Sequence, residues 1–196
     1  QKDQFRLVDG LTGVVHPGDK VAIIGEEGTG KSSLLKWLCR CPEVNDYLEA
    51  QGSYQCTFQQ MGYLPQFLPS QEEPLSVYDF LFHDLDANEI DYSYLAKLAS
   101  DFQLDQDFLY SSQKMGTLSG GQKIKIQLMK ILLPHPDILL LDEPSNDLDY
   151  ESIQWLENFI RTSDLAILYI SHDVVLLKNT ATSILHLEKI AHQQRA

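Results

Sequence analysis

The sequence predicts an α/β fold with a mainly parallel sheet, and three apolar runs with the helical patterns that follow them lead to this prediction. Residues 137–141 and 165–170 are almost continuously apolar, as strands buried on both faces of a parallel sheet are. Residues 150–161 connect them with helical periodicity, so we expect a right-handed βαβ crossover. A third apolar run, 21–24, ends at a glycine-rich loop that is followed by a helical pattern over 32–38.

Length and composition fit one domain with a substantial core. The chain has 196 residues and 43% of them are hydrophobic, which argues against disorder. The net charge of −13 makes it a poor generic binder of nucleic acid or anionic lipid. The most apolar stretch, 131–141, contains Pro134 and Pro136 and is shorter than the ~18 residues that span a bilayer. We therefore expect no direct membrane insertion. Three cysteines without metal-ligand spacing indicate reduced thiols, and so a cytoplasmic location.

The middle of the chain differs from the rest in charge and periodicity. Residues 67–117 include ten Asp or Glu, two Lys and nine aromatic residues. Apolar residues recur there at steps of three and four, as in Val77, Phe80 and Leu81. We interpret 67–117 as a helical subdomain inserted into a single domain that covers residues 1–196. Its acidity is interpreted as a solvated face.

The glycine-rich loop has the spacing of a phosphate-binding loop, G-x-x-x-x-G-K-S. Glycines let the backbone approach a ligand closely, and successive N–H groups and the following helix N-terminus then attract phosphate. Lys31 would bring a full charge to the β- and γ-phosphates, and the Ser32 hydroxyl would ligate Mg²⁺. The predicted nucleotide-binding residues are Gly25, Gly28, Thr29, Gly30, Lys31, Ser32 and Ser33.

Two adjacent carboxylates follow the apolar run at 137–141. The carboxyl ends of strands in an open α/β sheet are where ligands gather. Asp142 is therefore placed to hold Mg²⁺. Glu143 points to the other side, where it would polarise an attacking water as general base. The alternative is an acidic turn before Pro144, but the phosphate-binding loop upstream favours the catalytic interpretation.

Together with these motifs, residues 118–122 (LSGGQ) resemble the signature of the ATP-binding-cassette (ABC) ATPases. The resemblance covers almost the whole chain. It implies a P-loop NTPase core with a mainly parallel sheet, an antiparallel β portion and an inserted helical subdomain, and it implies ATP and Mg²⁺ as cofactors. In ABC cassettes an aromatic residue before the glycine loop usually stacks on adenine. Phe5 is the one aromatic residue before Lys31, and it either has that role or packs in the core.

Other segments resemble further motifs of the family. Asp142 and Glu143 match its metal-binding acid and its catalytic glutamate. Residues 63–66 are similar to the Q-loop, which implies that Gln66 reaches Mg²⁺ and the attacking water. Residues 145–149 are similar to the D-loop, and 170–173 to the switch segment. The latter implies that His172 contacts the γ-phosphate and joins Glu143 and Gln66 as a catalytic residue.

The resemblance also implies a partner. In this family two cassettes pack head to tail, and the signature of one caps the ATP on the glycine loop of the other. The partner would be a second cassette, in the same chain or in a homodimer, and the pair would close with ATP and open after hydrolysis. Ser119, the backbone N–H groups of Gly120 and Gly121, and the helix behind them would hold the γ-phosphate of the partner's ATP. The predicted signature residues are Leu118, Ser119, Gly120, Gly121 and Gln122.

Several segments resemble one branch, ABC-F, whose members carry two cassettes on one chain and act on the ribosome, in translation or in antibiotic resistance. Residues 123–128 follow the signature where transporter cassettes usually have an arginine-rich helix. The segment EPSNDLD around the D-loop is similar to the T-N-H-L-D of ABC-F rather than the S-A-L-D of transporters. Residues 171–177 resemble the ABC-F pattern after the switch histidine, and 184–190 the strand before its inter-cassette linker.

Two other functions stay open. The chain begins at Gln1 rather than Met, so we expect one cassette, the first, of a longer ABC-F protein. The main alternative is an ATP-binding subunit that energises a membrane ABC transporter. A binding module that does not hydrolyse ATP is a further alternative. The presence of both carboxylates and of the switch histidine argues against it.

Overall fold

A five-stranded parallel sheet forms the centre of the computed structural model, which describes residues 10–46, 55–85 and 90–188. The strand order is β2-β3-β4-β1-β5, and each neighbouring pair is parallel. The strands are β1 (Lys20–Gly25), β2 (Met61–Leu64), β3 (Ile138–Asp142), β4 (Ala166–Ile170) and β5 (Ser183–Leu187). Helices connect the strands, which confirms the predicted α/β fold.

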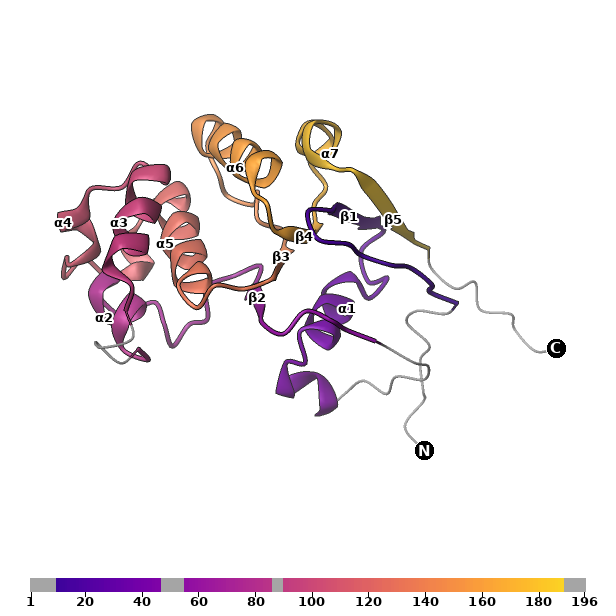
Figure 1. The fold of residues 1–196 in the computed structure, drawn as a ribbon, viewed down its shortest axis with the longest axis horizontal. Helices are drawn as coiled ribbons and strands as arrows, with labels where there is room; N and C mark the ends of the chain where they lie inside the picture. The colour runs from indigo at the N-terminus through magenta and orange to yellow at the C-terminus, as the bar shows by residue number, and fades with distance from the viewer. Residues whose placement is uncertain (1–9, 47–54, 86–89, 189–196) are drawn as a thin grey trace.

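Helices cover both faces of this sheet (Figure 1). They are α1 (Lys31–Leu38), α2 (Val77–Phe82), α3 (Tyr92–Asp101), α4 (Gln106–Leu109), α5 (Gly120–Leu132), α6 (Tyr150–Thr162) and α7 (Val174–Thr180), with the 3₁₀ turns η1 (Pro42–Asp46) and η2 (Met115–Thr117). Because side chains alternate along a strand, β3 contributes to two cores. Ile138 and Leu140 join the cluster that contains residues of α1, and Leu139 and Leu141 join the cluster with α5 and α6.

The strands and helices predicted for the sheet are present. The apolar runs at 21–24, 137–141 and 165–170 correspond to β1, β3 and β4, and the helical patterns at 32–38 and 150–161 to α1 and α6. In the βαβ unit, β3 and β4 are direct neighbours, with Leu141 opposite Tyr169.

The expected antiparallel β portion is not found in the part of the chain that the structure describes. Every strand pair there is parallel, and the antiparallel contact is an isolated bridge between Ser76 and Lys114. The segment 10–19, before β1, contains three glycines and a proline, which disfavour strands, and it is irregular. Phe5, the candidate for adenine stacking, lies outside the described residues.

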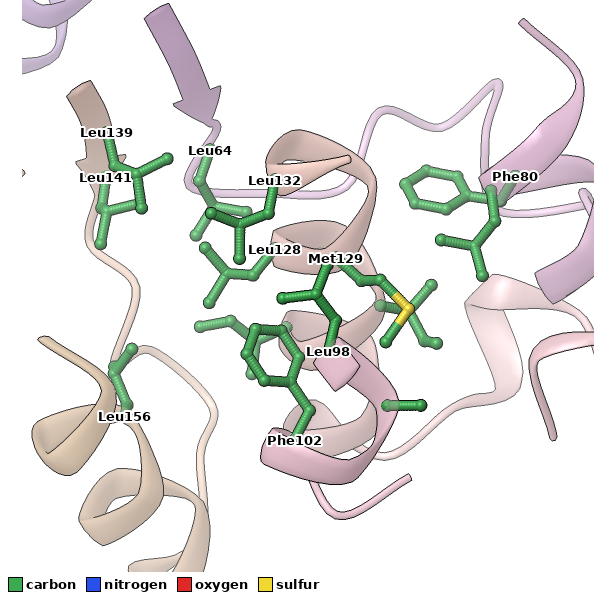
Figure 2. Packing of buried hydrophobic residues seen from close by; sticks show 14 of the residues in the cluster. Leu64, Phe80, Leu98, Phe102, Leu128, Met129, Leu132, Leu139, Leu141 and Leu156 are labelled. Atoms are coloured by element: carbon green, nitrogen blue, oxygen red, sulfur yellow. The ribbon is translucent and has the colours of Figure 1, made fainter. Parts of the chain in front are cut away.

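Residues 67–117 contain α2, α3, α4 and η2, which lie beside α5 at the end of the molecule opposite β5 (Figure 1). Their apolar side chains join the core of the sheet through α5. In Figure 2, α5 lies between Phe80 on one side and Leu139, Leu141 and Leu156 on the other. The ring of Phe102 packs against Trp155 and Phe159 of α6. The boundaries 67 and 117 for a separate subdomain stay a prediction.

Part of the acidity of this segment has a structural role that the sequence analysis did not assign. Asp91 caps α3, with Oδ1 accepting from the backbone N–H groups of Ser93 and Tyr94. Asp105 caps α4 by accepting from the N–H of Asp107. Carboxylates at these positions satisfy N–H groups that have no partner inside the helix.

Replacing Leu98 by Ala tests the packing of α3 on α5. Leu98 is 5% exposed, so its removal leaves a cavity between the two helices. We expect the free energy of unfolding to fall by about 2–5 kcal/mol in chemical denaturation. Lys97→Ala, one residue earlier and exposed, is the matched control and should change it by less than ~0.5 kcal/mol. Equal effects of the two substitutions would contradict this packing.

Candidate nucleotide-binding and catalytic site

The glycine loop between β1 and α1 has backbone conformations that require glycine. Gly28 and Gly30 have φ angles of +77° and +89°, in the left-handed region that other residues rarely adopt. Gly25 leaves no room for a side chain, because a Cβ there would lie 2.2 Å from the carbonyl oxygen of Leu187. The loop therefore passes directly beside β5 and places Lys31 at the start of α1.

The side chain of Lys31 is buried within the loop. Its Nζ donates hydrogen bonds to the carbonyl oxygens of Gly25 at 2.8 Å and Glu26 at 2.9 Å. Thr29 is also buried, and its hydroxyl donates to the carbonyl oxygen of Glu26 at 2.9 Å. Glu26 and Glu27 are exposed, in accordance with a loop that binds phosphate through its backbone. The positive charge of Lys31 is thus held at the centre of the loop.

Asp142, the last residue of β3, accepts hydrogen bonds from two hydroxyl groups. Ser32 Oγ donates to Oδ1 at 3.0 Å, and the Tyr63 hydroxyl donates to Oδ2 at 3.3 Å. Asp142 is 2% exposed, and this burial raises the pKa of its carboxyl group, which both hydrogen bonds oppose. Carboxylate and hydroxyl oxygens are ligands that Mg²⁺ prefers, so Ser32 and Asp142 fit the predicted metal pair. Ser33 is half-buried one residue further along α1.

Gln66 lies further from this pair. It is exposed and follows β2 by two residues. Within the described ranges, its side chain forms no hydrogen bond with Ser32 or Asp142. Its contact with a metal and a water stays a prediction.

Glu143 is buried directly beyond β3 and contacts the predicted switch histidine. Its Oε1 lies 3.0 Å from Nε2 of His172. The backbone N–H of Glu143 donates to the carbonyl oxygen of Ile170 at 3.1 Å, so the ends of β3 and β4 are joined. This bond brings His172, two residues beyond β4, next to the carboxylate. Glu143 itself has a φ angle of +50°.

Burial raises the pKa of the Glu143 carboxyl group, while the charge of His172 acts in the opposite direction and the charge of Asp142 adds to the rise. A carboxylate with a raised pKa is a better proton acceptor, as a general base for water must be. The geometry therefore suits the predicted role of Glu143.

A pair of serines connects the segments that follow β3 and β4. Ser145 Oγ lies 3.2 Å from Ser171 Oγ, which also accepts from the backbone N–H of Asp173 at 3.0 Å. Ser145 lies in the predicted D-loop and Ser171 in the predicted switch segment, but no sequence pattern predicted their contact. Two segments that follow adjacent parallel strands must emerge side by side, and this is the information that would have revealed the pair.

The predicted signature forms the N-terminus of α5. Ser119 is the N-cap, and its Oγ accepts from the backbone N–H of Gln122 while Gln122 Oε1 accepts from the N–H of Ser119, both at 3.2 Å. This is a capping box. Ser119 is exposed, and Leu118 is buried before it.

The two glycines of the signature pack against the same chain. A Cβ on Gly120 would lie 2.3 Å from the carbonyl oxygen of Asp147, and a Cβ on Gly121 would lie 2.0 Å from Ser152 Oγ. The signature therefore contacts the D-loop and the start of α6. It is not next to the glycine loop, since α5 and α1 belong to different sides of the sheet (Figure 1).

This arrangement defines a P-loop ATPase of the cassette type. A glycine loop, a hydroxyl–carboxylate pair and a carboxylate–histidine pair lie at the carboxyl ends of β1, β3 and β4, and a separate signature caps a helix elsewhere. The family described as ABC transporter matches residues 8–146. The chain belongs to this family and is an ABC ATPase cassette.

Individual relatives agree with this assignment and indicate the branch. The ATP-binding protein Uup of Buchnera aphidicola (subsp. Schizaphis graminum) is 35% identical over 89% of the chain. The energy-dependent translational throttle protein EttA of Mycobacterium tuberculosis is 30% identical over 93% of it. Both are ABC-F proteins, which confirms the predicted likeness to that branch. The chain spans 29% of the length of the first and 38% of the second.

A solved structure supports the fold. The nucleotide-free ATP-binding cassette of an ABC transporter superposes with a TM-score of 0.75, at 18% identity, over 97% of this chain and 86% of that one. None of the helices in the described ranges has the length and apolar character needed to cross a membrane.

Replacing Glu143 by Gln tests the burial of this charge. The pKa of Glu143 in the folded chain lies above its ordinary value of 4.5, so the folded state binds the proton more tightly than the unfolded state. Stability is therefore lost as pH rises from 4.5 through the folded pKa. The Gln variant avoids this loss, and we expect its Tm to exceed that of the unmodified chain by about 2–4 °C at pH 7.

Thermal unfolding between pH 4.5 and 7.5 measures this difference, which should grow with pH and then level off. Asp149→Asn is a control in which the change in stability should have the opposite sign, because hydrogen bonds from Ser152 hold the pKa of the exposed Asp149 below its ordinary value. That variant should be the less stable one throughout this range, and the difference should vanish only when pH falls below 3.8 and through the folded pKa of Asp149. A pH-independent difference for the Gln variant would contradict the raised pKa.

Proposed function

We propose that this chain is one cassette of a two-cassette ABC-F protein that binds ATP with Mg²⁺ and hydrolyses it in the cytoplasm while associated with the ribosome. The contact of Glu143 with His172 at 3.0 Å, beside the buried Asp142, is the observation that carries the hydrolytic part. The name of EttA, a translational throttle protein, and the chain's likeness to it support the ribosomal part.

The chain's own residues account for binding and for proton transfer. Lys31 and the backbone of the glycine loop would hold the phosphates. Glu143 would accept the proton of the attacking water, and His172 would keep the carboxylate oriented through its Nε2 contact. A bound Mg²⁺ would supply positive charge to the phosphate oxygens. Ser32 and Asp142 would hold it, with its other ligands coming from the nucleotide and water.

The signature would act on the nucleotide of the second cassette. The Ser119 hydroxyl accepts one hydrogen bond within α5, and its own proton is still available for a phosphate oxygen. Gly120 and Gly121 supply N–H groups of the first helical turn, which lack intrahelical partners in any α-helix. We therefore infer a head-to-tail pair of cassettes, with residues 67–117 as the helical subdomain that carries the signature.

The alternative is an ATP-binding subunit that energises a membrane ABC transporter. The superposition on a transporter cassette favours it, but that likeness at 18% identity concerns the fold alone. The two hypotheses differ in the partner, which is a ribosome in one and a membrane subunit in the other.

The first prediction of this proposal concerns hydrolysis and the cap. In the complete protein that contains this chain, Glu143→Gln should lower turnover at this nucleotide by about 10²-fold or more, so that ATP is retained after rapid gel filtration. Ser119→Asp, introduced without the first substitution, should weaken ATP binding at the glycine loop of the second cassette, because the new carboxylate repels the γ-phosphate bound there.

Ser100→Asp adds the same charge at an exposed position of α3 and should leave ATP binding by the second cassette unchanged. Unchanged turnover in the Glu143→Gln variant would remove this residue from the mechanism. Unchanged ATP binding by the second cassette in the Ser119→Asp variant would exclude the signature as a cap.

The second prediction concerns the partner. The Glu143→Gln protein should sediment with ribosomes through a sucrose cushion in the presence of ATP and Mg²⁺. A Lys31→Ala variant should not, because it lacks the charge that holds the phosphates. Recovery of the Glu143→Gln protein in the membrane fraction, with no ribosomal association, would support the transporter subunit instead.

A further inference from the structure

Tyr63 lies at the centre of strand β2 and reaches the metal pair from the edge of the sheet. In the parallel ladder of β2 and β3, Tyr63 is opposite Leu140, and Leu64 is opposite Leu141. The half-buried ring packs against the apolar cluster on the α1 side of the sheet. The strand and this packing together fix the ring, so the hydroxyl is delivered to Asp142 from a rigid element.

The two oxygens of Asp142 have different donors. Ser32, at the start of α1, donates to Oδ1 at 3.0 Å, and Tyr63 donates to Oδ2 at 3.3 Å. Asp142 is only 2% exposed, so its orientation is set by protein groups rather than by bulk water. Each hydroxyl therefore constrains one edge of the carboxylate.

The two donors also differ in what they do when a cation binds. Ser32 belongs to the phosphate-binding loop motif and is itself a proposed ligand of Mg²⁺, so its oxygen would bind the cation through a lone pair while its proton stays available for Asp142. Tyr63 has no such second task in the proposed site. Its hydrogen bond to Oδ2 would remain and would keep Oδ1 directed at the place where Ser32 and the cation meet.

We propose that Tyr63 is a positioning residue for Mg²⁺, acting through Asp142 rather than through contact with the cation or the nucleotide. This inference rests on the proposed function, since it concerns the same site. Hydrogen-bond partners of metal-ligating side chains fix the orientation of the ligand, and their removal commonly lowers metal affinity by about 10–100-fold.

Tyr63→Phe tests this role because it removes the hydroxyl and retains the ring that packs beside β3. The affinity of the full chain for ADP is measured by calorimetry, once with Mg²⁺ and once with EDTA. We expect the gain in affinity that Mg²⁺ provides to fall by about tenfold or more. The affinity in EDTA should stay the same, because the glycine loop and Lys31 are untouched. Thermal unfolding without nucleotide verifies that the variant is folded.

The matched control is Tyr92→Phe, which removes the hydroxyl of a tyrosine that is 55% exposed on α3. It should change neither affinity. If Tyr63→Phe alters both affinities equally, or leaves the Mg²⁺-dependent gain intact, Tyr63 is not a positioning residue. If the unmodified chain itself fails to bind ADP under both conditions, the proposed nucleotide site fails, which is a different result from either of these.

Discussion

The parallel pairing of β3, β4 and β1 is the constraint on which the site depends. In this ladder Asp142 lies opposite Ile170, and Ile170 lies opposite Ile23. The three strands therefore end at one edge of the sheet. Each strand is followed by a different functional segment, and none of these segments has to fold by itself into a binding shape. The sheet brings together residues that are more than a hundred positions apart in the chain.

At this edge of the sheet the buried apolar strands give way to polar residues, and this change sets the electrostatics of the site. Apolar side chains of β3 pack on both faces of the sheet up to Leu141, and the next two residues are carboxylates with little exposure to water. Their charge is costly unless hydroxyl, histidine or metal partners balance it. Ser32, Tyr63 and His172 are such partners, and each comes from a different element. The polar chemistry of the site thus follows from the burial of the strand that carries it.

Much of this arrangement was predictable from the sequence because continuous apolar runs and a glycine motif report directly on backbone structure. The strands at 21–24 and 137–141 and the helix at 32–38 are examples. The residues Asp142 and Glu143 followed from their place after such a run. What escaped prediction depends on register between strands. The hydroxyl of Tyr63 reaches Asp142 only because β2 pairs with β3 in one particular alignment, and no local pattern in the sequence reports that alignment.

In the acidic middle of the chain, residues 67–117, composition did not predict the role of individual carboxylates. Its composition suggested a solvated face, yet Asp91 and Asp105 are structural caps of short helices. Composition alone does not distinguish a carboxylate that solubilises a surface from one that begins a helix, since the difference lies in the backbone conformation of a single residue. The predicted antiparallel portion came from family resemblance rather than from a strand pattern, and the described segment before β1 is rich in glycine and proline.

Gly120 and Gly121, at the start of α5, each lie close to a different group of the same chain. Each faces a group of its own chain at a distance where a methyl group would collide, the carbonyl oxygen of Asp147 in one case and Ser152 Oγ in the other. Their small size is thus required by the monomer's interior before any nucleotide or second cassette is considered. A descendant of this protein that had lost Glu143, the proposed general base, would still be expected to keep both glycines. In a diverged cassette the two glycines therefore indicate that the fold is preserved. They do not by themselves indicate that the cassette still hydrolyses ATP.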